Sequence, residues 1–144
     1  MWHASPKNVT HDAGVSRPAA YNGAMQRDTL SMEVVAGTAK GTTVVRLTGS
    51  ITLSTCFDLQ DFLRADQSDC LIVDMRGVKY VDSSGIGCLV NGYVSHQMTG
   101  GKLVLAGANT RVLETLAETR VAKFFTICGS VEEAERETSA SAVR

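Results

Sequence analysis

Several features that would mark out a function are missing from this sequence of 144 residues. The net charge is −1, from 14 basic and 15 acidic residues, which gives no electrostatic footprint for nucleic acid or an anionic membrane. Purely apolar runs such as Leu71–Val73 are far too short to span a bilayer. No basic segment followed by an apolar stretch opens the chain. We therefore expect a cytoplasmic protein that binds neither nucleic acid nor membrane.

Motifs of common enzyme classes are also missing. There is no G-x-S-x-G elbow and no G-x-x-x-x-G-K-[ST] loop, and Gly85-Ile86-Gly87 lacks the third glycine of a dinucleotide fingerprint. No ligand cluster has metal-binding spacing, and His96 is interpreted as a solvated helix residue. On a shared helix, His96 would lie roughly 20 Å from Ser83, too far to act as its base. We expect no catalytic residue, no metal and no cofactor.

The sequence has few cysteines, and none of them belongs to a motif that predicts a disulfide or a metal site. The four residues Cys56, Cys70, Cys88 and Cys128 form no C-x-x-C pair, and each lies inside an apolar helix or strand pattern. This favours a reduced protein over a disulfide-bonded one.

The composition fits one folded domain with a tail. Hydrophobic residues make up 44% of the chain, enough for a core in a single domain. Residues 1–28 contain both prolines and two of the three histidines without apolar periodicity, which predicts a disordered tail. The folded domain is predicted over residues 29–137, followed by a frayed C-terminus over residues 138–144.

Apolar periodicity predicts alternating strands and helices from residue 30 onward. A hairpin turn at residues 37–41 joins the first two strands, and the later strands alternate with helices. This order predicts an α/β fold with a mixed, mostly parallel sheet of about five strands and about four helices. The predicted strands are 31–36, 42–48, 70–75, 103–106 and 124–128, and the predicted helices are 53–65, 83–98, one capped by Asn109 and one after Ser130.

The junction Asp82-Ser83-Ser84-Gly85 lies between an apolar strand and a glycine-rich helix. A serine at a helix N-terminus lies beside exposed N–H groups and the positive end of the macrodipole, which favour a phosphate. Asp and Ser are equally the preferred helix caps, so a purely structural role remains open.

Three glycines in the predicted helix 83–98 need a reason, because each costs about 1 kcal/mol relative to alanine. We expect close packing against a neighbouring backbone at Gly92. At Gly85 and Gly87, beside Ser83, we expect instead that small size leaves the hydroxyl accessible.

The segment from Leu71 to Gly87, LIVDMRGVKYVDSSGIG, resembles the signature of the STAS domain, and most closely that of bacterial anti-sigma factor antagonists. The resemblance extends over roughly residues 31–135 and includes the strand GKLVLAG and the helix VLETL. It implies that Ser83, directly after Asp82, is the phosphorylated serine.

The resemblance also implies partner switching. The unphosphorylated protein would bind an anti-sigma factor with serine kinase activity, freeing a sigma factor. Phosphorylation of Ser83 would end that complex, and a metal-dependent serine phosphatase would restore it. The implied partner-binding residues are Asp82, Ser83, Ser84, Gly85, Ile86, Gly87, Ser50 and Thr52.

One stretch departs from the family pattern. Where antagonists commonly read Gly-Glu-(Leu/Ile)-Asp after the second strand, this chain has Gly49-Ser50-Ile51-Thr52 and lacks both acidic residues. An alternative is therefore a STAS module that never switches and serves as a scaffold or accessory subunit in a signalling or lipid-transport complex.

Overall fold

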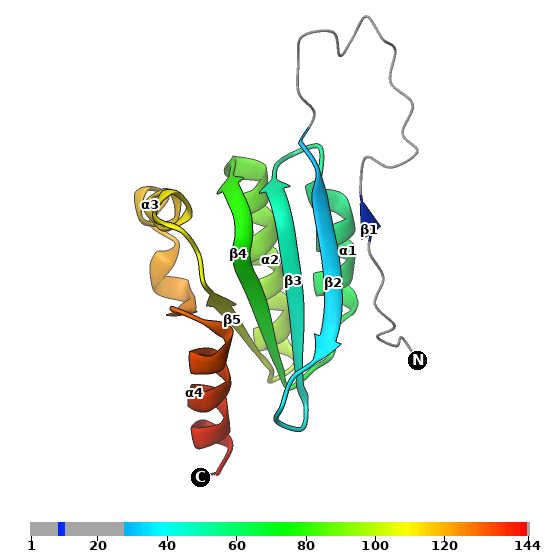
Figure 1. Cartoon of the computed structure of the whole chain (residues 1–144), viewed down its shortest axis with the longest axis vertical. Helices are drawn as coiled ribbons and strands as arrows, with labels where there is room; N and C mark the ends of the chain where they lie inside the picture. Colours follow the sequence, from blue (N-terminus) through cyan, green and yellow to red (C-terminus); the bar gives the residue numbers. More distant parts are fainter. Residues whose placement is uncertain (1–8, 11–27, 144) are drawn as a thin grey trace, which may run out of the picture.

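The computed structural model describes residues 9–10 and 28–143, which form one mixed sheet with helices on both faces (Figure 1). The strand order is β1-β2-β3-β4-β5-β6. Pairs β1–β2 and β2–β3 are antiparallel, and the remaining three pairs are parallel. The strands are β1 (Val9–Thr10), β2 (Leu30–Ala36), β3 (Thr42–Ile51), β4 (Cys70–Val81), β5 (Lys102–Ala106) and β6 (Thr126–Cys128). The predicted fold class is confirmed.

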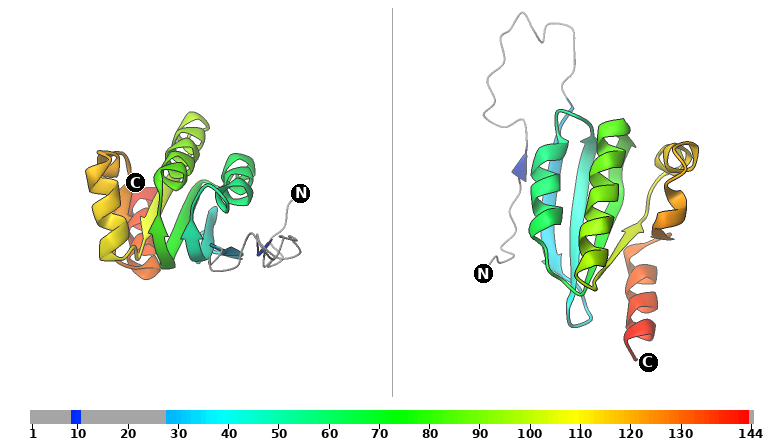
Figure 2. Two further views of the ribbon diagram at one scale, coloured as in Figure 1. Left: turned by 90° about the horizontal axis from the view of Figure 1, so that it is seen from above. Right: turned by 180° about the vertical axis from the view of Figure 1, so that it is seen from behind.

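Two helices lie side by side on one face of the sheet and a third packs on the other face (Figure 2). The larger core fills the space between the sheet and α1 and α2, and a smaller core lies under α4 around Ala134. The helices are α1 (Cys56–Ala65), α2 (Ser83–Met98), α3 (Thr110–Glu118) and α4 (Val131–Val143), with a short 3₁₀ helix at Ala122–Phe124.

Strand β4 is twice as long as the apolar run predicted. Its first five residues pair with both β3 and β5, but beyond Asp74 it pairs with β3 alone. Along that second half, Val78 and Val81 are buried while Arg76 and Lys79 are exposed. A run buried on both faces therefore gives way to a strand buried on one face, which continuous hydrophobicity could not predict.

The limits of α2 match the prediction, but its buried face does not. Helical spacing predicts one apolar face from Ile86, Leu89, Val90, Tyr93, Val94 and Gln97, but Val94 and Gln97 are exposed. Cys88, Gly92 and His96 are buried instead. The interpretation of His96 as a solvated residue is therefore wrong, because α2 buries a second side against α1 as well as the sheet.

The remaining elements follow the predictions with shifted ends. Asn109 caps α3, its side chain accepting from the N–H of Val112 at 2.8 Å. The predicted strand 124–128 is shortened to β6, because residues 122–124 form the 3₁₀ helix. Ser130 accepts from the N–H of Glu133 at the start of α4, which continues to Val143.

The predicted tail lies mostly outside the described residues. Of residues 1–28, the structure describes β1 and Asp28. Val9 pairs with Met32 and Thr10 with Ser31. The Tyr80 hydroxyl donates to Asp28 at 2.7 Å, so the chain enters β2 beside the end of β4.

Candidate functional site

Asp82 connects the start of α2 to the loop between β3 and α1. One carboxylate oxygen accepts from the N–H of Gly85 at 2.9 Å, which caps the helix. The other accepts from the N–H of Leu53 at 3.2 Å. The Asp82 N–H donates to the carbonyl of Ile51 at 3.0 Å. These three bonds hold the residue before Ser83 in one position.

Ser83 is the first helical residue of α2 and its side chain is exposed. Over residues 28–138, no hydrogen-bond partner is found for its hydroxyl. Ser84 is half-buried. The hydroxyl of Ser83 is therefore accessible to a reagent in solution, at a helix end that favours an added negative charge.

The three glycines of α2 differ in what an added side chain would meet. A methyl group at Gly92 would lie 2.8 Å from the Leu63 side chain, so close packing explains this residue, although a side chain rather than the expected backbone makes the contact. A methyl group at Gly85 would lie 2.4 Å from the carbonyl oxygen of Ile51, so packing explains this residue and the accessibility interpretation is wrong there. Gly87 is exposed, with nothing within 4 Å of the added atom.

The other predicted partner residues are mostly covered. Ile86 is buried in the main core. Ser50 and Thr52 are also buried, and their backbone groups hold the loop before α1: the Ser50 carbonyl accepts from the Thr55 hydroxyl at 2.7 Å, and the Thr52 N–H donates to the same hydroxyl at 2.9 Å. The positions that carry acidic residues in the resembled family are therefore interior positions here.

Two large apolar side chains beside this site are exposed, and the sequence reasoning missed both. Leu53 is 61% exposed and Phe57 is 54% exposed. Leu53 is fixed to Asp82 through its own N–H, and Phe57 is on the first turn of α1. The apolar spacing of α1 identified its buried residues Leu59, Phe62 and Leu63. Nothing in that spacing indicated that Phe57 contributes to an exposed surface.

Helices α1, α2 and α3 all begin at the same rim of the sheet, the carboxyl end of the parallel strands (Figure 2). In open α/β sheets this rim is where ligands and partners bind. Tyr80, near the same rim, is covered on its ring face by Arg111, whose guanidinium carbon lies 4.8 Å from the ring centroid. Its hydrogen bond to Asp28 raises the pKa of the Tyr80 hydroxyl.

His96 forms a buried pair with Asp66 at the other end of the two helices. Its Nε2 lies 3.0 Å from Asp66 Oδ2 and its Nδ1 lies 2.9 Å from the carbonyl oxygen of Gly92. The Gly92 carbonyl only accepts, so Nδ1 donates to it, and the carboxyl group of Asp66 at Nε2 favours the protonated ring, in which both nitrogens donate. The hydrogen bond to Asp66 raises the pKa of His96 above its ordinary value of 6.5. The pair fastens α1 to α2 and lies far from Ser83.

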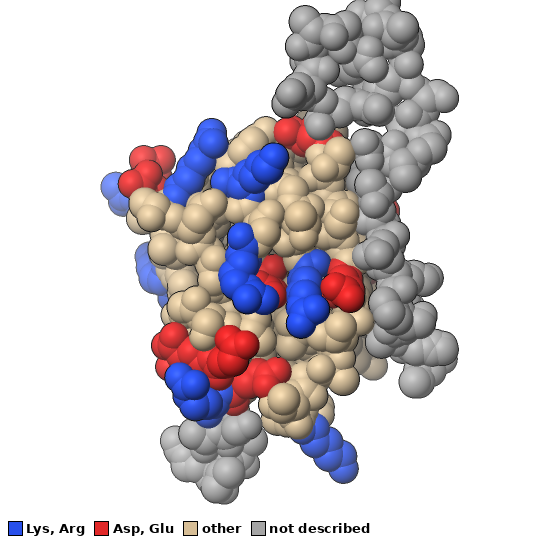
Figure 3. Space-filling model, viewed as in Figure 1, with Lys and Arg blue, Asp and Glu red and all other residues tan. Residues whose placement is uncertain are grey.

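The opposite sheet face carries a second charged group, seen in the middle of Figure 3. Asp74 is buried, and both its oxygens accept from the Arg76 side chain, at 3.1 and 2.8 Å. Arg46 lies 3.9 Å from the same carboxylate and 3.6 Å from Glu33. Burial opposes ionisation of Asp74, but the hydrogen bonds and charges of these arginines lower its pKa.

A potential ligand cluster, which spacing did not predict, lies at the start of α4. Atoms of Cys128, Glu133 and Glu137 lie within 4.8 Å of one another. Glu133 accepts from the N–H of Gly129, and the Cys128 thiol is oriented toward Glu137 at 3.7 Å. Hydrogen bonding and helix capping account for the arrangement.

All four thiols are buried. Burial raises the pKa of Cys70 to about 11 and that of Cys88 to about 12. Thiols with these values are almost fully protonated at neutral pH, so they are poor nucleophiles.

The sequence profile of the STAS domain matches residues 33–134. The fold also matches solved structures. An anti-sigma factor antagonist from Mycobacterium paratuberculosis is 20% identical, with 74% of this chain and 93% of that chain covered and a TM-score of 0.64. The Bacillus cell fate determinant SpoIIAA in its phosphorylated form is 14% identical, with 74% and 98% covered and a TM-score of 0.59.

A sulfate transporter family protein from Wolinella succinogenes is 18% identical, with 76% of this chain and 93% of that chain covered and a TM-score of 0.65. Identities this low establish the fold alone. The profile match covers most of the chain, and the protein belongs to the STAS domain family. Within the described residues, no helix is long and apolar enough to cross a bilayer.

Proposed function

We propose that this protein is an anti-sigma factor antagonist that switches partners through phosphorylation of Ser83, and that it is a binding protein rather than an enzyme. The observation that carries the proposal is the exposed Ser83 hydroxyl at the start of α2. The preceding residue, Asp82, is held in place by two backbone N–H groups that donate to its carboxylate. In its unphosphorylated form the protein binds an anti-sigma factor with serine kinase activity in the cytoplasm, and a sigma factor is released.

The contact surface is the rim around Ser83. Leu53, Phe57 and Gly87 are exposed there, and Asp82 and Ser84 are partly accessible. The buried Gly85, Ile86, Ser50 and Thr52 shape this rim from below. Apolar side chains bind best when water is excluded around them, so a neighbouring dianion would bring water into the contact.

Phosphorylation then acts on the complex rather than on the fold. A phosphoserine adds between about 1.5 and 2 negative charges at pH 7. At the N-terminus of α2 this charge is favourable to the helix, whereas in the interface it adds desolvation and repulsion from Asp82. A loss of about 3 kcal/mol reduces affinity more than a hundredfold. A metal-dependent serine phosphatase reverses the change.

The test uses the full chain and the anti-sigma-type serine kinases of the organism that makes it, purified one at a time. With ATP, we expect one added phosphate, located on Ser83 by peptide mapping. Ser83→Ala is expected to bind the kinase and remain bound, and Ser83→Asp to bind at least tenfold more weakly. Ser84→Ala is the matched control and should still accept one phosphate. Equal binding of the two Ser83 variants would contradict the electrostatic switch.

The second candidate is a STAS subunit that docks without switching. The hydroxyl residues Ser50 and Thr52 in place of the acidic pair, and the match to a sulfate transporter family protein, favour it. Failure of every kinase to phosphorylate Ser83, together with stable association in a larger complex, would support this candidate.

A further inference from the structure

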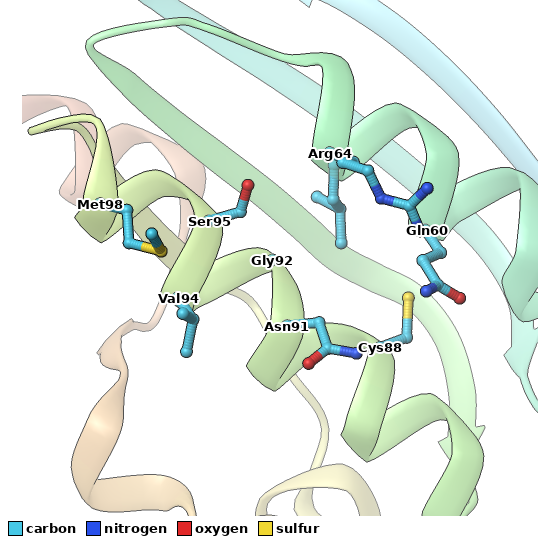
Figure 4. A pocket seen from close by; sticks show the side chains of 9 residues that line it. Gln60, Arg64, Cys88, Asn91, Gly92, Val94, Ser95 and Met98 are labelled. Atoms are coloured by element: carbon cyan, nitrogen blue, oxygen red, sulfur yellow. The ribbon is translucent and has the colours of Figure 1, made fainter.

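A groove of about 290 Å³ runs between the outer faces of α1 and α2 (Figure 4). Both helices start at the Ser83 rim and continue away from it in parallel. The lining residues are Gln60, Leu63 and Arg64 from α1 and Cys88, Asn91, Gly92, Val94, Ser95 and Met98 from α2. Gly92 and Leu63 both line it, and a methyl group added at Gly92 would lie 2.8 Å from the Leu63 side chain.

The groove continues the apolar surface of the rim. Phe57 is one helical turn before Gln60 and two turns before Arg64 on α1. On α2, Cys88 lies about 8 Å along the axis from Ser83 and Met98 about 22 Å, at 1.5 Å per residue. Phe57 therefore lies on the same side of α1 as Gln60 and Arg64, which line the groove.

The lining has a distinct chemical character. Val94 is 45% exposed and Met98 is 81% exposed. Arg64 is the charged residue of the lining, and its nearest recorded carboxylate, Asp61, lies 3.9 Å away with both side chains mostly in water. An exposed pair of that kind contributes little, so Arg64 is available to another carboxylate. Methionine adapts to irregular partner surfaces and is common at binding sites.

We propose that this groove is a second docking site for the anti-sigma factor kinase. It takes an amphipathic segment of that kinase that places an apolar side chain against Val94 and Met98 and a carboxylate on Arg64. This inference rests on the proposed function. The same kinase has to reach Ser83 at the head of α2, and an interface of standard size covers about 800 Å² per partner, a patch roughly 30 Å across. Such a patch with Ser83 and Phe57 toward one edge extends along the groove as far as Met98.

The distance between the two contacts gives the groove a specific role. Substitutions separated by more than about 10 Å without shared partners usually have additive effects. Groove contacts near Met98 therefore contribute the same factor to binding of the unphosphorylated and the phosphorylated protein. The serine then determines when the complex forms, and the groove contributes to the choice of partner.

The test measures affinity of the full chain for the kinase that phosphorylates Ser83, in ADP. The groove variants are Arg64→Glu and the double variant Val94→Ser, Met98→Gln, all at exposed positions. Matched controls are Leu113→Gln and Ile127→Gln, which are 38% and 37% exposed on other surfaces. We expect each groove variant to weaken binding about tenfold and the controls less than about twofold. The same factors should appear in the Ser83→Asp background, and thermal unfolding should show that all variants remain folded.

The outcomes separate this inference from the proposed function. Normal affinity of both groove variants, with Ser83 still phosphorylated, would overturn the groove site and leave the switch intact. A loss of self-association in place of kinase binding would assign the groove to a second copy of the chain, and would also overturn it. If no kinase binds or phosphorylates the chain, both proposals are overturned.

Discussion

The carboxylate of Asp82 accepts a hydrogen bond from the backbone N–H of Leu53, which precedes it by 29 residues. Its other oxygen caps α2 at Gly85. The exposed Leu53 and the exposed Ser83 are therefore attached to one rigid group. A partner that contacts the leucine meets the serine in a fixed relative position, which favours a switch that needs no change of fold.

Removal of this carboxylate is expected to destabilise the protein. Asp82→Ala loses the cap of α2 and the bond to Leu53, and should lower the free energy of unfolding by about 1–2 kcal/mol. Asp82→Asn keeps a cap oxygen and should lose less. Urea unfolding measures both. Ser83→Ala is the control, because its exposed hydroxyl has no recorded partner, and a loss as large as that of Asp82→Ala would contradict the assigned roles.

The paired substitutions Gly85→Ala and Gly87→Ala are expected to have opposite effects. An added methyl at Gly85 meets the Ile51 carbonyl at 2.4 Å and a Val81 methyl at 2.6 Å, so it should destabilise the protein by about 1–3 kcal/mol. At Gly87 the methyl meets nothing and the helix gains about 0.5–1 kcal/mol. Thermal unfolding should give a lower midpoint than the wild type for Gly85→Ala and a higher midpoint for Gly87→Ala. Two losses of equal size would show that the backbone approach at Gly85 is not the cause.

The pair His96–Asp66 makes stability depend on pH. The pKa of His96 is raised in the folded protein, first by the Asp66 hydrogen bond. The stabilisation is thus fully present below the unfolded value of about 6.5, and is lost as pH rises through the folded pKa. Urea unfolding of the wild type between pH 6 and 9 should show this decline.

Asp66→Asn removes the charge that the imidazolium faces and serves as the comparison. Its unfolding free energy should be lower at pH 6 and should change less up to pH 9. NMR titration of the ring carbon signals, with His96→Gln used for assignment, should give a lower pKa for His96 in this variant. An unchanged titration would contradict the assignment of the raised His96 pKa to the hydrogen bond with Asp66.

Arg76→Ala is expected to make the protein more sensitive to acid. Burial raises the pKa of Asp74, and the hydrogen bonds and charge of Arg76 lower it. Without Arg76, the pKa of this carboxyl therefore rises from its lowered folded value. Stabilisation by a carboxyl with a lowered pKa is present above its unfolded value and is lost as pH falls through the folded pKa. The midpoint of acid unfolding, followed by circular dichroism, should therefore move to higher pH. Arg64→Ala, which removes an exposed pair 3.9 Å long, should not move it.

Regular periodicity predicted most of the fold, because most elements bury one face against one core. The full extent of α2 and the cap at Asn109 followed from local residue types. The second half of β4 did not, because Arg76 and Lys79 interrupt the apolar run on the open side. Such one-sided burial depends on which strand lies next to β4, and local sequence does not contain that information.

The exposure of the candidate site residues was predicted in part. The exposed position of Ser83 agrees with the sequence reasoning, whereas Ser50 and Thr52 are buried in the loop that supports it. His96 was predicted to be exposed and is buried, whereas Val94 was predicted to be buried and is exposed. The reason is tertiary: α2 packs against α1 through Gly92, and a helix with two buried sides has no single apolar stripe.

The helix start at Ser83 has a further consequence under the proposed switch, in which this residue gains and loses a phosphate. Ser83 is the first residue of α2, so a phosphate there would face the positive partial charge of that helix end, which belongs to the backbone itself. Under that proposal, phosphorylation would change the stability of the fold little, and the change in free energy would appear mainly in the affinity of the complex.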